Sequence, residues 1–154
     1  ETLGNYVISA PLKRSFTSTV YLSARNDGAV SKDVAIKEDN WLYSNQDRRK
    51  VFNIEAQHLF DLSGGNENIC TIYDANKTPD GRNYMVMEYI EGLELDVYFE
   101  KNNTDILVIL QYFIVICNTI GYSHQQNIIH GDINPSNILI TFDGKLKIID
   151  FGLS

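Results

Sequence analysis

The feature that most constrains this chain is a pair of aliphatic stretches that carry three oxygen-bearing side chains. The first stretch, residues 128–140, holds Asp132 and Asn137, and the second, residues 146–152, holds Asp150. An aliphatic frame that presents two carboxylates and one carboxamide at one edge is typical of a site for a hard cation that carries phosphate. Mg²⁺ takes oxygen ligands from one or two side chains and completes its shell with phosphates and water.

These residues resemble the catalytic loop and the metal-binding loop of the eukaryotic-type protein kinases, which usually read His-Arg-Asp-Leu-Lys-Pro-x-Asn and Asp-Phe-Gly. Here the first loop runs from His130 through Asp132 to Asn137, and Asp150-Phe151-Gly follows. The resemblance implies that Asp132 accepts the proton of the substrate hydroxyl. It also implies that Asn137 and Asp150 hold magnesium ions and that Phe151 packs as a switch.

Two upstream residues extend the resemblance. Lys37 ends a Val-Ala-Ile-Lys run like that of the third strand of the kinase small lobe, and Glu55 follows it by eighteen positions on a predicted helix. The resemblance implies that Lys37 binds the α- and β-phosphates of ATP and that Glu55 forms an ion pair with it. The alternatives are a lysine that reaches solvent from a strand end and a solvated helix glutamate.

Residues 83–90 and the Glu-Gly that follows resemble the kinase hinge. The resemblance implies that Met87 is the gatekeeper, and that the backbone carbonyl of Glu88 and the backbone amide of Ile90 meet the adenine edge. It also implies an apolar slot for the base, formed by Leu12, Val20, Ala35 and Leu139.

The hydrophobic pattern predicts an α+β fold. Runs of β-branched and aromatic residues predict strands, and apolar residues at helical spacing predict helices. The strands are expected at residues 6–10, 18–25, 33–37, 69–73, 83–90, 138–141 and 145–149, and the helices at 46–62, 95–101 and 105–125. By the resemblance, residues 1–90 form the small lobe and hinge, an antiparallel sheet with one regulatory helix. Residues 91–154 form the first helical and hairpin part of the large lobe.

Local signals add detail to these elements. Thr104 or Asp105 can cap the helix at 105–125, and His130 is expected to hold its loop rather than to react. Turns are predicted at Asp80-Gly81 and Asp143-Gly144. The apolar residues that recur at helical spacing in 46–62, and so are expected on one face, are Val51, Ile54, Leu59 and Leu62, with Ala56 between them.

The loop at residues 12–18 departs from the kinase pattern. Lys13, Ser15 and Ser18 stand where the family has glycines that let backbone N–H groups approach the ATP phosphates. Tight clamping of the phosphates is therefore in doubt, and the loop is interpreted either as an ordinary hairpin turn or as a functional lid.

Two further departures lie beside Asp132. Gly131 replaces an arginine that in the family commonly pairs with a phosphorylated activation loop, so any activity is not expected to depend on that switch. Asn134 replaces a lysine that steadies the γ-phosphate. A neutral amide supplies no charge, and such cation contacts are worth roughly a few kcal/mol at a developing charge. We therefore expect slower turnover with nucleotide binding retained.

Composition narrows the class of partner. The chain has 154 residues and a net charge of −7 without a basic block, which argues against nucleic acid or an anionic membrane as a partner. Cys70 and Cys117 show no metal-binding spacing, so a reducing cytoplasm is expected. The apolar run at residues 106–117 is too short to span a bilayer.

The kinase pattern stops just past Asp-Phe-Gly, so we expect an incomplete kinase domain that is inactive by itself. The apolar face at residues 106–122 would otherwise form a larger exposed patch than soluble monomers usually tolerate. It is expected to be covered by a complementing large-lobe segment or by a second copy in a dimer.

Three functions remain in view. The first is ATP- and magnesium-dependent phosphoryl transfer to a serine or threonine hydroxyl of a protein. The second is a nucleotide-binding pseudokinase scaffold that regulates a protein partner, which the glycine-free loop and Asn134 favour. The third is a small-molecule kinase similar to the aminoglycoside phosphotransferases, in which a His-Gly-Asp sequence also occurs.

Overall fold

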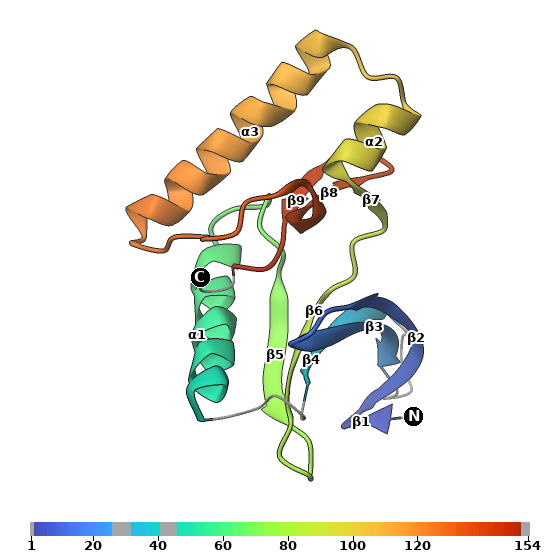
Figure 1. The fold of residues 1–154 in the computed structure, drawn as a ribbon, viewed down its shortest axis with the longest axis vertical. Coiled ribbons are helices and arrows are strands. Elements are labelled where there is room, and N and C mark those ends of the chain that lie inside the picture. The colour runs from blue at the N-terminus through green and yellow to red at the C-terminus, as the bar shows by residue number, and fades with distance from the viewer. Residues whose placement is uncertain (1, 26–31, 41–45, 152–154) are drawn as a thin grey trace. The chain divides into compact units, whose positions relative to one another are not determined.

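The computed structural model describes residues 2–25, 32–40 and 46–151, with side chains omitted for residues 46–49. The chain divides into two compact units (Figure 1). The first unit comprises Glu1–Ala56 and Ile72–Tyr89, and the second comprises Gln57–Thr71 and Ile90–Ser154. The expected boundary between residues 90 and 91 lies one residue beyond the second break, but the structure also assigns residues 57–71 to the second unit.

The first unit is built on a curled antiparallel sheet of six strands in the order β1-β2-β3-β4-β6-β5. The strands are β1 (Thr2–Leu3), β2 (Tyr6–Arg14), β3 (Ser18–Arg25), β4 (Asp33–Asp39), β5 (Ile72–Lys77) and β6 (Asn83–Glu88). β2 runs four residues beyond its predicted end, because two register shifts let it stay paired with β3 through Pro11. The turn predicted at Asp80-Gly81 is present, and Gly81 has φ +88°.

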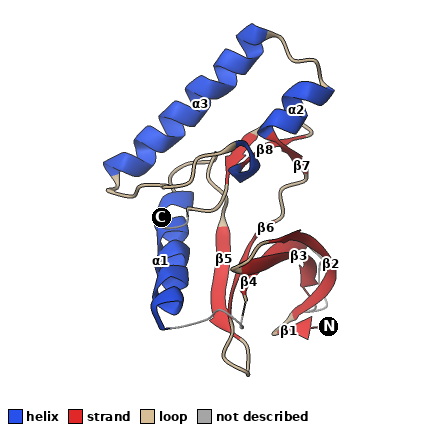
Figure 2. Cartoon of the chain, viewed as in Figure 1, coloured by secondary structure: helices blue, strands red, loops and turns tan. Residues whose placement is uncertain are grey.

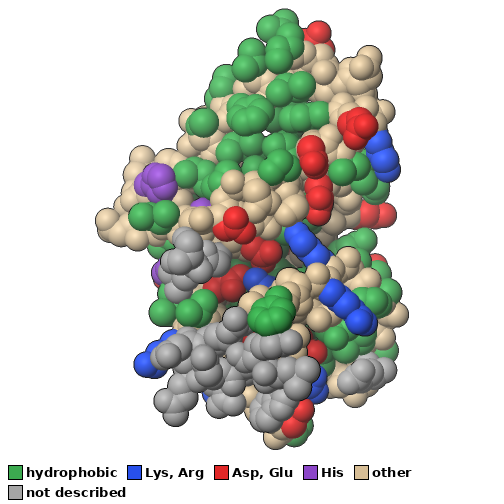
Figure 3. Space-filling model, in the orientation of Figure 1, with side chains coloured by type: hydrophobic (Ala, Val, Ile, Leu, Met, Phe, Trp, Pro, Cys, Tyr) green, Lys and Arg blue, Asp and Glu red, His purple; other side chains and the backbone are tan. Residues whose placement is uncertain are grey.

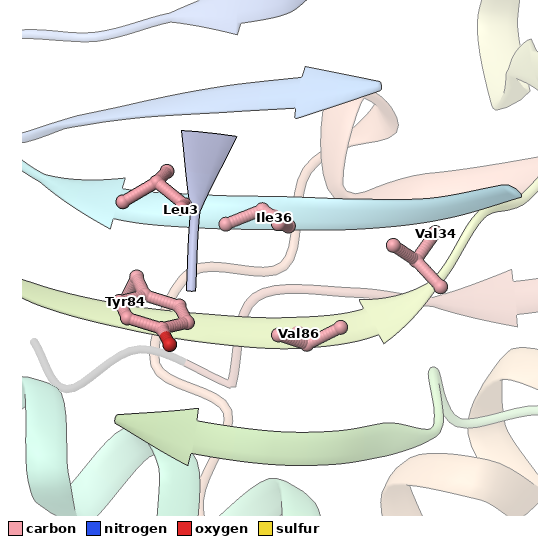
Figure 4. Packing of buried hydrophobic residues seen from close by; sticks show 5 residues of the cluster. All are labelled: Leu3, Val34, Ile36, Tyr84 and Val86. Atoms are coloured by element: carbon pink, nitrogen blue, oxygen red, sulfur yellow. The ribbon is translucent and has the colours of Figure 1, made fainter. Parts of the chain in front are cut away.

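The two faces of this sheet have different contents. Val34 and Ile36 of β4 pack with Leu3, Tyr84 and Val86 into an apolar cluster (Figure 4). Because successive side chains of a strand point to opposite faces, Ala35 and Lys37 lie on the other face. Their cross-strand partners in β6 are Met87 and Met85.

Helix α1 (Gln46–Ser63) spans the boundary between the two units. Its buried apolar residues are Phe52, Ala56, Leu59 and Leu62. Val51 and Ile54, which the hydrophobic period assigned to the buried face, are 40% and 42% exposed. That assignment was wrong, because the buried stripe passes through Phe52 and Glu55 instead.

The second unit contains helix α2 (Leu95–Lys101) and helix α3 (Ile106–Gln125), both blue in Figure 2. It also contains a three-stranded antiparallel sheet in the order β7-β8-β9. The strands are β7 (Gly92–Glu94), β8 (Ile138–Thr141) and β9 (Leu146–Ile148), and the 3₁₀ turn η2 (Pro135–Asn137) precedes β8. The predicted turn at Asp143-Gly144 joins β8 to β9, and Gly144 has φ +83°.

The segment at residues 68–70 belongs to the second unit through β9. Ile148 donates its backbone N–H to Asn68 O at 2.7 Å, and Cys70 N–H donates to Ile148 O at 2.9 Å. Ile69 also forms a parallel bridge with Ile148. The strand predicted at residues 69–73 therefore begins only at Ile72, because the backbone groups before it are bonded to β9.

Helix α3 begins where its cap signal predicts. The Asp105 side chain accepts the Leu107 N–H at 2.8 Å. By length and composition alone this helix could cross a membrane, a property shared by core helices of soluble proteins. The apolar run that was judged too short for a span is thus part of a longer helix. Several of its large apolar side chains are exposed: Ile106, Leu107, Leu110, Phe113 and Ile114. Figure 3 shows hydrophobic side chains gathered over this helix.

Candidate functional site

In the first unit, the predicted ion pair between β4 and α1 is present. Lys37 Nζ lies 2.6 Å from Glu55 Oε1, and the two side chains are only 12% and 7% exposed. Glu55 sits on the buried stripe of α1, which aims its carboxylate at the sheet. The pair leaves a cation fixed on one face of the sheet, with its orientation set by a helix.

The apolar residues predicted to line a base share that face. Val20 of β3 pairs with Lys37, and Ala35 of β4 pairs with Met87 of β6. Ala35 and Met87 are buried and Val20 is half-buried. Leu12 lies at a register shift of β2 and is 45% exposed. Glu88 is half-buried at the end of β6. Four of the predicted first-unit residues, Val20, Ala35, Lys37 and Met87, thus share one face.

The turn between β2 and β3 is organised by Ser15. Its Oγ accepts the backbone N–H groups of Ser18 at 3.0 Å and Thr17 at 3.3 Å, and the Ser15 N–H donates to Ser18 O at 2.9 Å. The backbone amides that a glycine-rich loop would offer to phosphate are therefore bonded inside this turn. The ordinary hairpin turn is the alternative that this geometry favours.

In the second unit, His130 anchors the loop that carries Asp132. The ring is 1% exposed, its Nε2 donates to Ile149 O at 2.9 Å, and its Nδ1 accepts the Asp132 N–H at 3.2 Å. These bonds require the neutral tautomer with the proton on Nε2, and burial lowers the pKa of His130 below its ordinary value. The ring also packs on Phe151, with centroids 4.6 Å apart. The structural role predicted for His130 is confirmed.

The Asp132 carboxylate is exposed but is held at both oxygens. Asn137 Nδ2 donates to Asp132 Oδ2 at 3.0 Å and to the Asp132 backbone O at 2.9 Å. Asn134 Nδ2 donates to Asp132 Oδ1 at 3.0 Å. Each carboxylate oxygen retains lone pairs for a further proton or ligand.

Asp150 is brought beside Asn137 by the backbone. The N–H of Ile149, the residue before Asp150, donates to Asn137 O at 3.0 Å. This hydrogen bond joins the backbone just before Asp150 to the loop that carries Asn137. Asp150 is half-buried and has φ +57°, a left-handed conformation that aspartate tolerates better than most residues. Phe151, fully buried against His130, fixes the chain just past it.

The oxygen atoms of Asn137 and Asp150 are suited to binding Mg²⁺ that already carries phosphate, rather than a metal ion held by protein side chains alone. Among the described residues there is no group of three or more His, Cys, Asp or Glu side chains that could hold a metal ion. Because Asn137 Nδ2 faces two oxygen acceptors of Asp132, its Oδ1 is the atom left for a cation. One carboxamide oxygen and the Asp150 carboxylate suit Mg²⁺ whose remaining ligands are phosphates and water.

The remaining predicted residues have distinct surroundings. Leu139 is half-buried in β8, and Ile90 is half-buried at the start of the second unit. Gly152 lies outside the described residues. The role of Asn134 as a cap and a carboxylate partner was missed, although Asn followed by Pro is a sequence signal for a helical N-terminus.

Comparison with known proteins gives a consistent result across most of the chain. A family model described as the protein kinase domain matches residues 16–154. The chain is 34% identical over 156 residues to the serine/threonine-protein kinase PrkC of Bacillus subtilis (strain 168), covering 98% of this chain and 23% of that protein. It is 30% identical over 151 residues to the serine/threonine-protein kinase PknL of Mycobacterium tuberculosis (strain ATCC 25618 / H37Rv), covering 96% of this chain and 36% of that protein.

A eukaryotic relative matches as well. The chain is 36% identical over 124 residues to the cyclin-dependent kinase-like 2 of Pongo abelii, covering 79% of this chain and 24% of that protein. The chain thus spans between 23% and 36% of the length of these three relatives.

Proposed function

Because this chain belongs to the protein kinase family, we propose that it carries groups for transferring a phosphoryl group from ATP to a serine or threonine hydroxyl of a protein. The observation that carries the proposal is the loop in which Asp132, Asn137 and the residue before Asp150 are joined by hydrogen bonds. The serine/threonine-kinase names of two relatives support the class of acceptor.

Asp132 is proposed as the group that accepts the proton of the attacking hydroxyl. Its carboxylate is exposed, so a substrate can reach it, and two carboxamides hold it in one orientation. General-base catalysis of this kind typically contributes 10²–10⁴-fold in rate. The buried His130 serves the same step indirectly, because its Nδ1 fixes the backbone N–H of Asp132.

Asn137 Oδ1 and the Asp150 carboxylate are proposed as the ligands of Mg²⁺ bound with ATP. When bound, the ion would neutralise charge that develops on the phosphates. The chain itself provides two hard oxygens on a backbone that Phe151 and His130 keep in place.

Lys37 is proposed as the cation for the α- and β-phosphates, with Glu55 as the residue that orients it. Their pairing at 2.6 Å restricts a long flexible side chain to one direction. Val20, Ala35 and Met87 offer an apolar surface on the same sheet face, which suits a planar base.

The test is a phosphoryl-transfer assay with ATP, Mg²⁺ and a generic protein substrate, run on this chain together with an intact kinase large lobe, beside a thermal shift of the 154-residue chain with ATP and Mg²⁺. Ligand at about 100-fold excess over Kd should add about 2.7 kcal/mol of stability. Asp132→Asn should lower transfer by about 100-fold or more and leave the thermal shift unchanged. Asp143→Asn, at an exposed carboxylate of the β8–β9 turn, is the matched control and should change neither quantity.

A binding scaffold without transfer is the second candidate, and the Ser15 turn favours it because its amides are already bonded. A thermal shift with ATP and Mg²⁺ but no transfer to any acceptor would select the scaffold. Transfer to small hydroxyl compounds rather than to protein would select the small-molecule kinase. Absence of both binding and transfer would contradict all three functions for this chain.

A further inference from the structure

We propose that Asn134 is a positioning residue that sets the orientation of the Asp132 carboxylate, a proposal that rests on the phosphotransfer function proposed above. The position was expected to matter through the charge of a missing lysine. The hydrogen bonds of the structure point to a different role, in which a carboxamide does what a lysine cannot.

The first observation is that both carboxylate oxygens of Asp132 accept hydrogen bonds. Asn134 Nδ2 donates to Asp132 Oδ1 at 3.0 Å and to its backbone O at 3.3 Å, while Asn137 Nδ2 donates to Oδ2 at 3.0 Å. An exposed aspartate otherwise has a broad range of rotation about its Cβ–Cγ bond. Two donors on opposite oxygens restrict that rotation and keep the plane of the carboxylate fixed.

The second observation is that the other end of the Asn134 amide is also held. Its Oδ1 accepts the Ser136 N–H at 3.0 Å and the Ser136 hydroxyl at 2.8 Å, which caps η2. Because the oxygen is turned to these donors, the NH₂ group must face Asp132. Asparagine supplies both an acceptor and a donor in one short side chain, whereas lysine has no acceptor.

Three variants separate positioning from capping. Asn134→Ser and Asn134→Asp keep an acceptor for the Ser136 N–H, since Ser, Asp and Asn cap about equally well, but both lose the Nδ2 donor to Asp132. Ionised aspartate has no donor, and the single O–H of serine lies on a side chain that is one atom shorter. Asn134→Ala loses both functions. If Asn134 only caps η2, the Ser and Asp variants should behave like the wild type and only the Ala variant should lose stability and activity.

The positioning role predicts another order. Asn134→Ser should lower kcat by about 10-fold, the size expected for one hydrogen bond to a charged group. Asn134→Asp should lower kcat further, because it places a second carboxylate against Asp132 Oδ1. The Tm and the Kd for ATP of Asn134→Ser should stay near the wild-type values. A kcat of Asn134→Ser within about twofold of wild type would overturn the proposal.

A measurement that needs no activity separates this proposal from the proposed function. The solvent exchange of the Asn134 Nδ2 protons, followed by NMR in the wild type and in Asp132→Ala, reports the hydrogen bond directly. We expect exchange several-fold slower in the wild type. Equal rates would overturn the proposed role of Asn134 even in an active protein, whereas slow exchange in a protein that transfers no phosphate would contradict only the phosphotransfer function.

Discussion

The two units position their functional groups in different ways. In the first unit, Lys37 forms an ion pair with Glu55, which lies eighteen residues away on a helix. In the second unit, Asp132 is held by neutral donors two and five residues away, with His130 linking the loop to Ile149. Orientation in the first unit therefore depends on where a helix packs, whereas in the second it is set within one short loop.

This difference determines how much stability each region should lose when one of its residues is substituted. A charge buried with one partner becomes strongly unfavourable when the partner is removed. A network of neutral hydrogen bonds loses one bond at a time, unless the group at its centre is removed. The predictions below run from the largest expected effect to the smallest.

His130→Ala should have the largest effect, because it removes the centre of the loop network. The substitution leaves a cavity beside Phe151 and leaves Ile149 O and the Asp132 N–H without their partner. We expect a loss of about 4 kcal/mol in the free energy of unfolding, measured by urea denaturation. His124→Ala, at an exposed position near the end of α3, is the control. Equal losses in the two variants would contradict a central role for His130.

Glu55→Gln should be the largest single effect in the first unit. It keeps the shape of the side chain but removes the negative charge that lies 2.6 Å from the ammonium group of Lys37, whose side chain is 12% exposed. We expect a loss of about 3 kcal/mol in the free energy of unfolding. Asp143→Asn breaks the exposed pair with Lys145 and should cause no measurable change. A similar small change in both variants would mean that the buried pair does not hold Lys37.

The pH dependence of stability should distinguish the two regions next. Because burial lowers the pKa of His130, the unfolded chain takes up a proton near pH 6.5 while the folded chain stays neutral. Stability is therefore complete above that pH and falls as the pH drops toward the folded pKa, by at most about 1.4 kcal/mol per pH unit. Urea denaturation between about pH 7 and pH 5 should show this slope. The same slope in His130→Phe would exclude His130 as its source.

Tyr112→Phe should have the smallest effect on the free energy of unfolding. It also tests whether the loop of Asp132 is held by its own hydrogen bonds alone. The Tyr112 hydroxyl donates to Gly144 O at 3.0 Å and so ties α3 to the β8–β9 turn, away from Asp132. Burial first, and then a side-chain hydrogen bond shared with Tyr98, raises the pKa of Tyr112 to about 12. We expect a loss of about 1 kcal/mol by urea denaturation, with solvent exchange of the Asn134 amide unchanged. Faster exchange at Asn134 would show that the loop depends on this distant tie.

Much of the loop region was predictable because its signals are local. Asp143-Gly144 predicted the β8–β9 turn, a cap at Thr104 or Asp105 predicted the start of α3, and His130 was expected to hold its loop. The first two predictions concern groups within a few residues of one another, and the role of His130 was implied by the resemblance of its loop to the kinase catalytic loop. Asn134 carried a local signal too, because Asn before Pro is typical of a helical N-terminus. It was interpreted only as the loss of a lysine charge, so its role as a cap and its hydrogen bond to Asp132 were missed.

The helix α1 shows where prediction from sequence failed. Its hydrophobic period placed Val51 and Ile54 on the buried face, but the structure buries Phe52 and Glu55. The side of a helix that becomes buried is decided by the surface against which the helix packs. The ion pair with Lys37 stabilises the rotation of α1 that turns Glu55 inward. The segment at residues 68–70 was likewise expected in a hairpin and is instead bonded to β9, since a backbone group can pair with any strand that tertiary packing brings near.

The sequence by itself determined the family, the fold class and the short loop of Asp132, Asn134 and Asn137, because these depend on residue identity and on contacts between near neighbours. Tertiary structure alone decided that the buried stripe of α1 passes through Phe52 rather than Val51 and Ile54, and that residues 68–70 pair with β9. These features depend on contacts between residues far apart in the sequence, which local sequence signals do not specify. Only the packing of a helix or strand against the core determines which residues meet.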